Sequence, residues 1–123
     1  MIHQSLTDKR MIDELNAGQK WLLSGASSRK LLSALRRELQ SITRNVYIFR
    51  CIPEQYEDLY DLLIDGTTVA RIEIPRDDRS REIIFEKWSV DEYLKMRKTL
   101  EKITSRKLQL AIELSRENSG EPP

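Results

Sequence analysis

Apolar residues recur at two different spacings along this chain of 123 residues, and the change between them separates helical from extended segments. From residue 8 to residue 43 most of them recur every three or four positions, which is typical of helices with one apolar face. From residue 45 to residue 88 they largely alternate with polar residues, which is typical of strands. The helical spacing then returns. The pattern predicts helices over about 8–23 and 29–43, strands over 45–52, 58–64, 67–75 and 82–88, and a last helix over about 90–116.

The two middle strands are joined by Asp65-Gly66. Asp-Gly between apolar runs is the strongest local signal for a hairpin, because a type I′ turn needs a positive φ at both of its central residues. If these two residues are the whole loop, Asp61 lies opposite Ala70. A slip of one residue would exchange the two faces of the hairpin. In the two-residue register we expect Asp61 and Glu73 to point to opposite faces.

Short connections between consecutive strands favour an antiparallel meander. With helices before and after the sheet, the chain belongs to the α+β class, and we expect two layers: N-terminal helices and a long C-terminal helix packed on a four-stranded antiparallel meander. We assign residues 1–118 to one domain and expect residues 119–123 to form a disordered tail. The last helix is apolar on most of its circumference near residues 108–114, so the first two helices or a second copy of the chain must cover it. We name Leu110 and Leu114 as self-association residues and expect a homodimer.

The charges nearly balance, with 21 basic and 20 acidic side chains, and this disfavours a general binder of polyanions. They are unevenly placed, however. A basic stretch from Arg29 to Arg44 is followed by an acidic segment from Glu54 to Asp65 that contains no lysine or arginine. Such a segment attracts a basic partner. We expect four of its acids to contact a protein partner: Glu54, Glu57, Asp58 and Asp61.

Groups suited to catalysis are sparse. The single cysteine, Cys51, lies in an apolar run, where we expect it to be buried, and it is consistent with the reducing cytoplasm. The only histidine, His3, has no visible partner for a metal site or a catalytic pair. We therefore predict no catalytic residue, no metal ligand and no cofactor. No apolar run approaches the length needed to span a bilayer and the start lacks a signal-peptide pattern, so we expect no membrane association.

One stretch, Asp61 to Pro75 (DLLIDGTTVARIEIP), resembles the hairpin of PD-(D/E)xK-type nucleases. The resemblance implies that Asp61 and Glu73 bind Mg²⁺, with Glu38 on the preceding helix as a further acid. In that superfamily a lysine stands two positions after the glutamate, where this chain has Pro75. Proline has no group that polarises a water molecule, so this position departs from the nuclease pattern.

The sequence supports two hypotheses. The first is a small non-enzymatic domain, regulatory or toxin-neutralising, that binds another protein through the acidic segment and itself through the last helix. The second is a nucleic-acid-binding protein or degenerate nuclease that uses Asp61, Glu73 and the basic helix. We rank protein above nucleic acid as the partner, because the acidic segment and the apolar last helix are present while a complete catalytic constellation is not.

Overall fold

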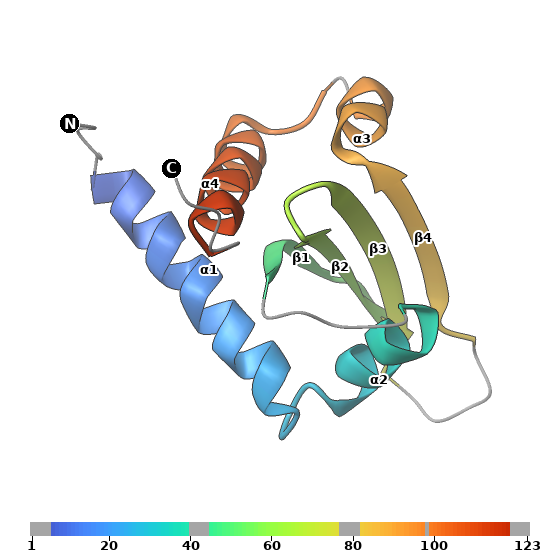
Figure 1. Cartoon of the computed structure of the whole chain (residues 1–123). Coiled ribbons are helices and arrows are strands. Elements are labelled where there is room, and N and C mark those ends of the chain that lie inside the picture. Colours follow the sequence, from blue (N-terminus) through green and yellow to red (C-terminus); the bar gives the residue numbers. More distant parts are fainter. Residues whose placement is uncertain (1–5, 40–44, 77–81, 98, 119–123) are drawn as a thin grey trace.

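The computed structural model describes residues 6–39, 45–76, 82–97 and 99–118. Within these residues the chain forms four helices and one four-stranded antiparallel sheet with the strand order β1-β2-β3-β4 (Figure 1). The predicted α+β class, the antiparallel meander and the long C-terminal helix are confirmed. The elements are α1 (Leu6–Ser24), α2 (Arg29–Glu38), β1 (Val46–Pro53), β2 (Glu57–Ile64), β3 (Thr68–Pro75), β4 (Ile84–Ser89), α3 (Val90–Met96) and α4 (Lys102–Asn118).

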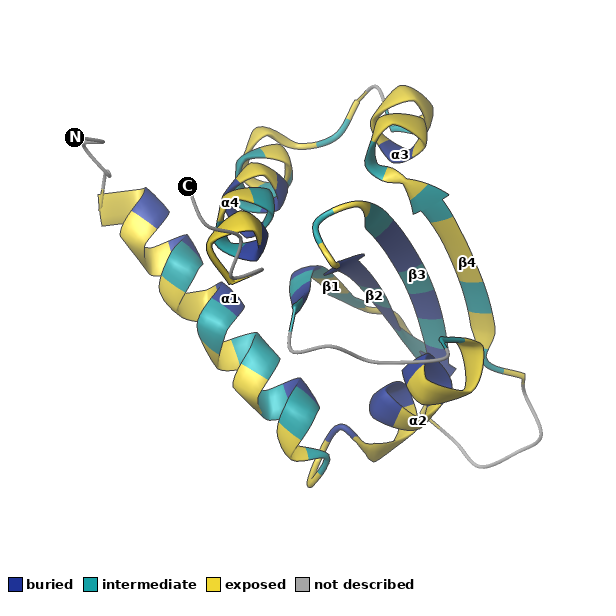
Figure 2. Ribbon diagram, viewed as in Figure 1, coloured by how far each residue is buried: buried dark blue, intermediate teal, exposed yellow. Residues whose placement is uncertain are grey.

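Apolar side chains are buried on both faces of the sheet. Figure 2 shows that buried residues are frequent in the central strands β2 and β3. On one face α2 and the C-terminal end of α1 enclose a cluster that includes Leu22, Leu35 and Ile72. On the other face α4 and the N-terminal half of α1 enclose a second cluster that includes Leu15 and Leu63. Helix α1 runs beside β1 and contributes to both clusters (Figure 1). Helices therefore lie on both faces, and α2 adds a layer to the two that were expected.

The chain reverses at Asp65 and Gly66 as predicted, with φ of 52° and 74°. The Thr67 amide donates to the Ile64 carbonyl oxygen at 3.2 Å, which closes the turn. The strand pairing is nevertheless shifted by one residue, because Thr67 is an additional loop residue and Ile64 lies opposite Thr68. The predicted two-residue register is therefore wrong.

This shift exchanges the faces of the hairpin. Asp61 lies opposite Arg71, and Leu59 lies opposite Glu73. Residues directly opposite in a sheet share a face, and so do residues two apart on one strand. Asp61 and Glu73 consequently lie on the same face, and the expectation that they point to opposite faces is also wrong.

The helix predicted over 90–116 is two helices, because the chain leaves the helical conformation at Arg97, where φ is -106° and ψ is 58°. A straight helix would hold Tyr93 and Leu108 about 22 Å apart. Both are buried in the same apolar cluster, so the chain has to fold back between them. As a result Met96 and Ile103, which were expected on one apolar stripe, are exposed.

Helix α4 is covered by its own chain. Leu110 is 2% exposed, and Leu114 is partly buried against the same cluster. Two ion pairs join α4 to α1, namely Arg106 with Asp8 (Nη2–Oδ2, 2.7 Å) and Lys107 with Glu14 (Nζ–Oε2, 2.8 Å). The sequence left two possibilities for covering the last helix, namely the first two helices or a second copy of the chain. In the structure α1 and the sheet cover α4.

Two further expectations differ from the structure. Cys51 is exposed, because a bulge between Ile48 and Arg50 shifts the pairing of the rest of β1. Helix α2 ends at Glu38, since Leu39 is already extended, whereas the sequence suggested an end near residue 43. Residues 119–123, for which a disordered tail was expected, and His3 lie outside the described residues.

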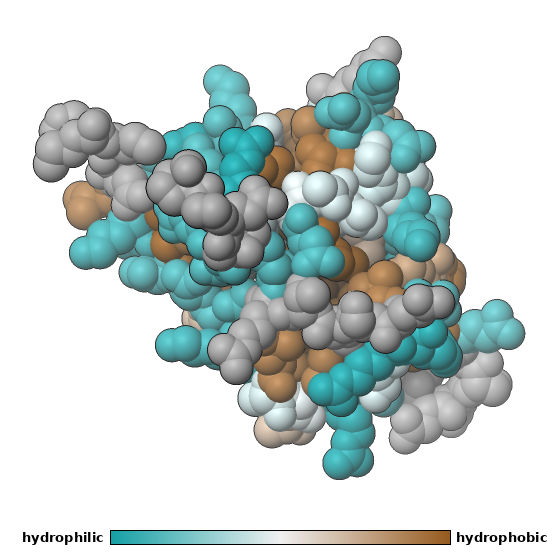
Figure 3. All heavy atoms as spheres, viewed as in Figure 1, coloured by the Kyte–Doolittle hydropathy of each residue, from teal (hydrophilic) through white to brown (hydrophobic). Residues whose placement is uncertain are grey.

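Hydrophilic side chains cover most of the face shown in Figure 3, and apolar surface appears there in separate areas. No helix within the described residues is long and apolar enough to cross a membrane.

Candidate functional site

Four charged residues, one from each strand, form a row across one face of the sheet. This charged row is Arg50, Asp61, Arg71 and Glu86, in which each residue lies opposite the next. Two irregularities create it: the additional loop residue Thr67 aligns β2 with β3, and the bulge in β1 brings Arg50 opposite Asp61. Opposite charges on neighbouring strands attract each other, so the alternation of sign stabilises the sheet.

Asp61 is fully buried and its carboxylate is bonded on both oxygens. Arg71 donates from Nε to Oδ1 at 2.8 Å and from Nη2 to Oδ2 at 3.0 Å. The Tyr93 hydroxyl donates to Oδ2 at 2.9 Å, and Arg50 Nη1 lies 3.4 Å from the same oxygen. A buried charge is tolerated when it is paired and hydrogen-bonded, and a bidentate arginine is the strongest such partner. Asp61 therefore joins β1, β2, β3 and α3.

Aromatic rings enclose this buried pair. The guanidinium carbon of Arg71 lies 5.8 Å from the centroid of the Trp88 ring, within the range of a cation–π interaction. Phe49 meets Tyr93 edge to face, with ring centroids 5.7 Å apart. The hydrogen bond to Asp61 raises the pKa of Arg71, and burial together with the charge of Asp61 raises the pKa of the Tyr93 hydroxyl. The Tyr93 hydroxyl thus keeps its proton at neutral pH and donates it in the hydrogen bond to Asp61.

The acids of the nuclease hypothesis share a face but not a site. Asp61 is bonded to Arg71, and Glu73 lies in the next row, opposite Leu59. Glu38 lines a cavity on the opposite face of the sheet. Within the described residues no group of three or more histidine, cysteine, aspartate or glutamate side chains is placed to hold a metal ion.

Four glutamates gather on this part of the sheet: Glu86 ends the charged row, and the other three lie beside the row, toward the β1–β2 connection. We call them the acidic patch: Glu54, Glu57, Glu73 and Glu86. Burial, and then the charges of the other three glutamates, raise the pKa of Glu73, so Glu73 lies within electrostatic range of each of them. Within the described residues, no ion pair joins any of the four to a lysine or arginine.

Apolar side chains lie among these glutamates. Ile52, Leu59 and Ile84 are in one row with Glu73 and belong to neither core cluster. Ile84 is 47% exposed. Leu59 is buried and Ile52 is partly buried, so the exposed apolar surface beside the glutamates comes from Ile84.

The structure brings only two of the four predicted partner-contact residues together. Glu54 and Glu57 belong to the acidic patch. Asp58 lies on the opposite face, where Arg76 Nη2 binds its Oδ1 at 2.8 Å, and Asp61 is buried. Sequence reasoning missed Glu73 and Glu86 as members of the patch, because only the pairing of β3 and β4 brings them to it.

The basic helix α2 lines a cavity of about 390 Å³ on the opposite face. Arg29, Lys30 and Arg76 lie around it, together with the stacked rings of Trp21 and Tyr60, whose centroids are 6.3 Å apart. The sequence showed no aromatic residue within the basic helix, but the fold places two beside it.

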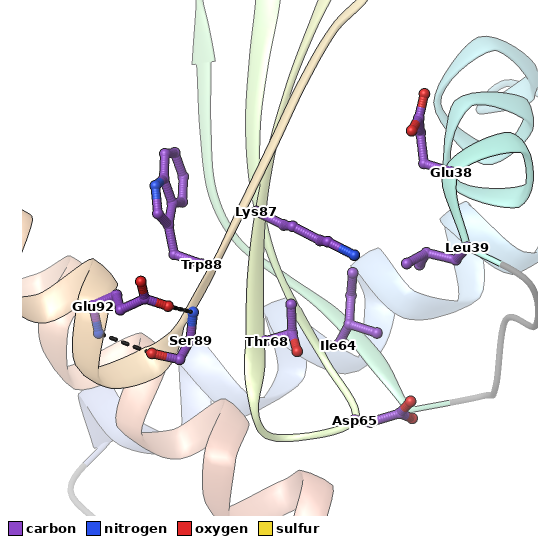
Figure 4. A pocket seen from close by; sticks show the side chains of 9 residues that line it. All are labelled: Glu38, Leu39, Ile64, Asp65, Thr68, Lys87, Trp88, Ser89 and Glu92. Carbon is purple, nitrogen blue, oxygen red and sulfur yellow. Dashed lines mark hydrogen bonds between the residues drawn. The ribbon is translucent and has the colours of Figure 1, made fainter.

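A larger cavity, of about 640 Å³, lies between the C-terminal end of α2 and β4. Figure 4 shows Lys87 reaching from β4 across this space toward Leu39 and Ile64. Below it, Ser89 and Glu92 form the predicted capping box, with mutual hydrogen bonds of 2.9 and 3.1 Å. The lining of the cavity is thus mixed: Lys87 is its single basic residue, Leu39, Ile64 and Trp88 are apolar or aromatic, and the acids Glu38, Asp65 and Glu92 lie around it.

Comparisons of this chain with protein-family models, with curated proteins and with solved structures found no match.

Proposed function

We propose that this protein is a non-enzymatic cytoplasmic domain, regulatory or toxin-neutralising in type, that binds a basic protein through the acidic patch. One observation carries the proposal. Two carboxylates of the acidic segment form ion pairs within the chain, Asp61 with Arg71 and Asp58 with Arg76, whereas none of the four glutamates of the patch forms an ion pair with a described lysine or arginine.

Like charges gathered on one surface repel one another. A basic partner relieves this repulsion, and the field of the patch accelerates its approach. Burial, and then the charges of the neighbouring glutamates, raise the pKa of Glu73, which agrees with such repulsion. Ile84 adds exposed apolar surface, which gains free energy when a partner covers it. The patch therefore combines an electrostatic and a hydrophobic reason to bind protein.

The proposal does not use Leu110 and Leu114 as a contact between copies, because Leu110 is buried in its own chain and Leu114 is partly buried. The expected homodimer stays a prediction, which light scattering after size exclusion tests directly.

A second candidate is binding of single-stranded nucleic acid at the cavity beside α2. It is favoured by the combination of Arg29, Lys30 and Arg76 with the rings of Trp21 and Tyr60, because basic grooves with aromatic platforms bind such strands. We rank it second, since Arg76 is already bonded to Asp58.

Calorimetric titration with a short lysine-rich peptide tests the first candidate. One variant replaces the four glutamates of the acidic patch by glutamine. A matched control removes four negative charges elsewhere, with the substitutions Asp13→Asn, Glu101→Gln, Glu113→Gln and Glu117→Gln. These four residues are exposed, so both variants change the net charge equally.

We expect the patch variant to bind the peptide at least about tenfold more weakly, while the control stays close to the original chain. Equal weakening in both variants would show a net-charge effect and contradict the proposal. Titration with a short single-stranded DNA, in the original chain and in Arg29→Gln/Lys30→Gln, tests the second candidate.

A further inference from the structure

Strand β4 forms an open edge of the sheet. The opposite edge strand, β1, lies beside α1, whereas no described strand pairs with the outer side of β4 (Figure 1). All six residues of β4 are exposed or partly buried, in contrast to the buried positions of β2 and β3 (Figure 2). An edge of this kind presents backbone N–H and C=O groups to which another extended segment can pair.

One hydrogen bond fixes which backbone groups of β4 point outward. The Val90 amide donates to the Thr67 carbonyl oxygen at 3.1 Å, and these two residues flank the opposed pair Ser89 and Thr68. Ser89 and Thr68 are therefore a non-hydrogen-bonded pair. In an antiparallel ladder hydrogen-bonded and non-hydrogen-bonded pairs alternate, so every second residue turns its backbone groups toward β3. The residues whose backbone groups point away from β3 are therefore Phe85, Lys87 and Ser89.

Only part of this edge is occupied within the chain. The Ser89 amide donates to the Glu92 carboxylate at 2.9 Å. No hydrogen bond joins the outward backbone groups of Phe85 and Lys87 to another described residue. Two residues thus offer two donors and two acceptors to an added strand, and Glu86 lies between them.

The charges of β4 disfavour a second copy of the chain at this edge. If two copies paired through β4, a twofold axis perpendicular to the sheet would keep each side chain on its own face. Two opposed residues would then be the same residue or lie an even number of positions apart in the sequence. The two registers centred on the strand then place Glu86 opposite Glu86, or Lys87 opposite Lys87. Like charges directly opposite each other destabilise a sheet.

We propose that β4 accepts an extended segment of a partner protein as an antiparallel fifth strand, with a lysine or arginine opposite Glu86 and an aspartate or glutamate opposite Lys87. The inference rests on the proposed protein-binding function and specifies how the partner lies. The charged row alternates in sign from Arg50 to Glu86 and ends on a negative charge at the open edge. A basic residue on the fifth strand continues that alternation, in a non-hydrogen-bonded pair, where opposed side chains are closest.

The opposite face supplies the second half of the recognition. Lys87 extends over the 640 Å³ cavity and forms no ion pair with a described residue (Figure 4). An acidic partner residue opposite Lys87 would neutralise its charge. The partner residue opposite Phe85 lies on the same face as that acid and contacts the apolar side chain of Phe85. Strand addition commonly combines backbone hydrogen bonds for affinity with pockets for alternate side chains. In chain order the partner therefore reads acidic, basic, then apolar opposite Phe85.

Two short peptides of alternating threonine and valine test this order, one with Glu-Lys at its centre and the other with Lys-Glu. The ¹⁵N-labelled full chain is titrated with each, and hydrogen exchange of its amides is followed. We expect the Glu-Lys peptide to bind about tenfold more tightly, because two attractive pairs replace two repulsive ones. It should also slow exchange at the Phe85 and Lys87 amides. The double variant Glu86→Lys/Lys87→Glu keeps the composition and net charge and should reverse the preference.

A proline tests the backbone contacts separately. Lys87→Pro removes an outward N–H and leaves the hydrogen bonds to β3 in place, and Lys87→Ala is its control with the N–H retained. We expect the proline variant to lose peptide binding and the alanine variant to keep most of it.

Equal affinity for the two peptides, or equal binding by the proline and alanine variants, overturns the strand addition. If the acidic-patch variant still weakens binding of the lysine-rich peptide in that case, the proposed function stands and only the docking geometry is wrong. If the patch variant has no effect either, both fail.

Discussion

Asp61→Asn removes the negative charge at the centre of the charged row while keeping the size of the side chain and one acceptor oxygen. Arg71 and Arg50 are then left beside a neutral group in a buried site. Breaking a buried ion pair by removing one partner costs about 3–5 kcal/mol. The side chains of Arg71 and Arg50 are 11% and 21% exposed, so solvent offsets part of this cost. We expect a loss of about 3 kcal/mol in the free energy of unfolding.

Two companion variants divide this loss. Tyr93→Phe removes only the hydroxyl that donates to Asp61, and we expect a cost of about 1.5 kcal/mol for a hydrogen bond to a charged acceptor. Asp61→Leu/Arg71→Met removes both charges of the bidentate pair. Because an apolar pair avoids the uncompensated charge, the double variant should be more stable than Asp61→Leu alone.

Urea unfolding, followed by the fluorescence of Trp21 and Trp88, measures all of these variants. A cost below about 1 kcal/mol for Asp61→Asn would refute the reasoning, because it would mean that the charge of Asp61 is not needed to balance the arginines. A gain in stability would refute it more strongly. It would mark Asp61 as an acid kept for function at the expense of the fold, as the nuclease hypothesis requires.

Three further predictions follow from local features. Glu73 has a raised pKa in the folded chain, so its ionised form is disfavoured there; Glu73→Gln should stabilise the protein at pH 7 by on the order of 0.5 kcal/mol or less, and the gain should vanish below about pH 4 in paired urea titrations. Gly66→Ala should cost about 1–2 kcal/mol, because φ is 74° and the new Cβ would lie 3.1 Å from Ser115 Cβ, whereas Gly18→Ala, inside α1 and 3.9 Å from Ile48 Cβ, should gain up to about 1 kcal/mol in thermal unfolding. Incubation with DNA and RNA in Mg²⁺ or Mn²⁺ should give no cleavage that depends on Glu73; loss of a cleavage activity in Glu73→Ala would restore the nuclease hypothesis.

Local signals in the sequence were sufficient for the elements and for the turn. Asp65-Gly66 adopts the positive φ values that the type I′ turn requires, and Ser89 with Glu92 forms the capping box. The alternation of apolar residues located all four strands in order. These features depend on a few neighbouring residues, so a single sequence reveals them.

Features that depend on pairing between distant segments were not predicted. Thr67 lengthens the loop by one residue and a bulge lengthens β1, and each irregularity exchanges the faces of the residues that follow. The charged row and the acidic patch both result from these shifts. The break at Arg97 was missed for a related reason, since the apolar spacing continues through it while the packing of Tyr93 requires the chain to fold back.

The central claim is that the acidic patch is the surface on which a basic protein binds, and a chemical-shift map of the ¹⁵N-labelled chain with the lysine-rich peptide tests it most directly. The account predicts that the shifted amides cluster on β4 and around Glu54, Glu57 and Glu73, and that they return to their free positions as salt is added. Shifts confined to α4, or to α2 and the cavity beside it, would contradict the account.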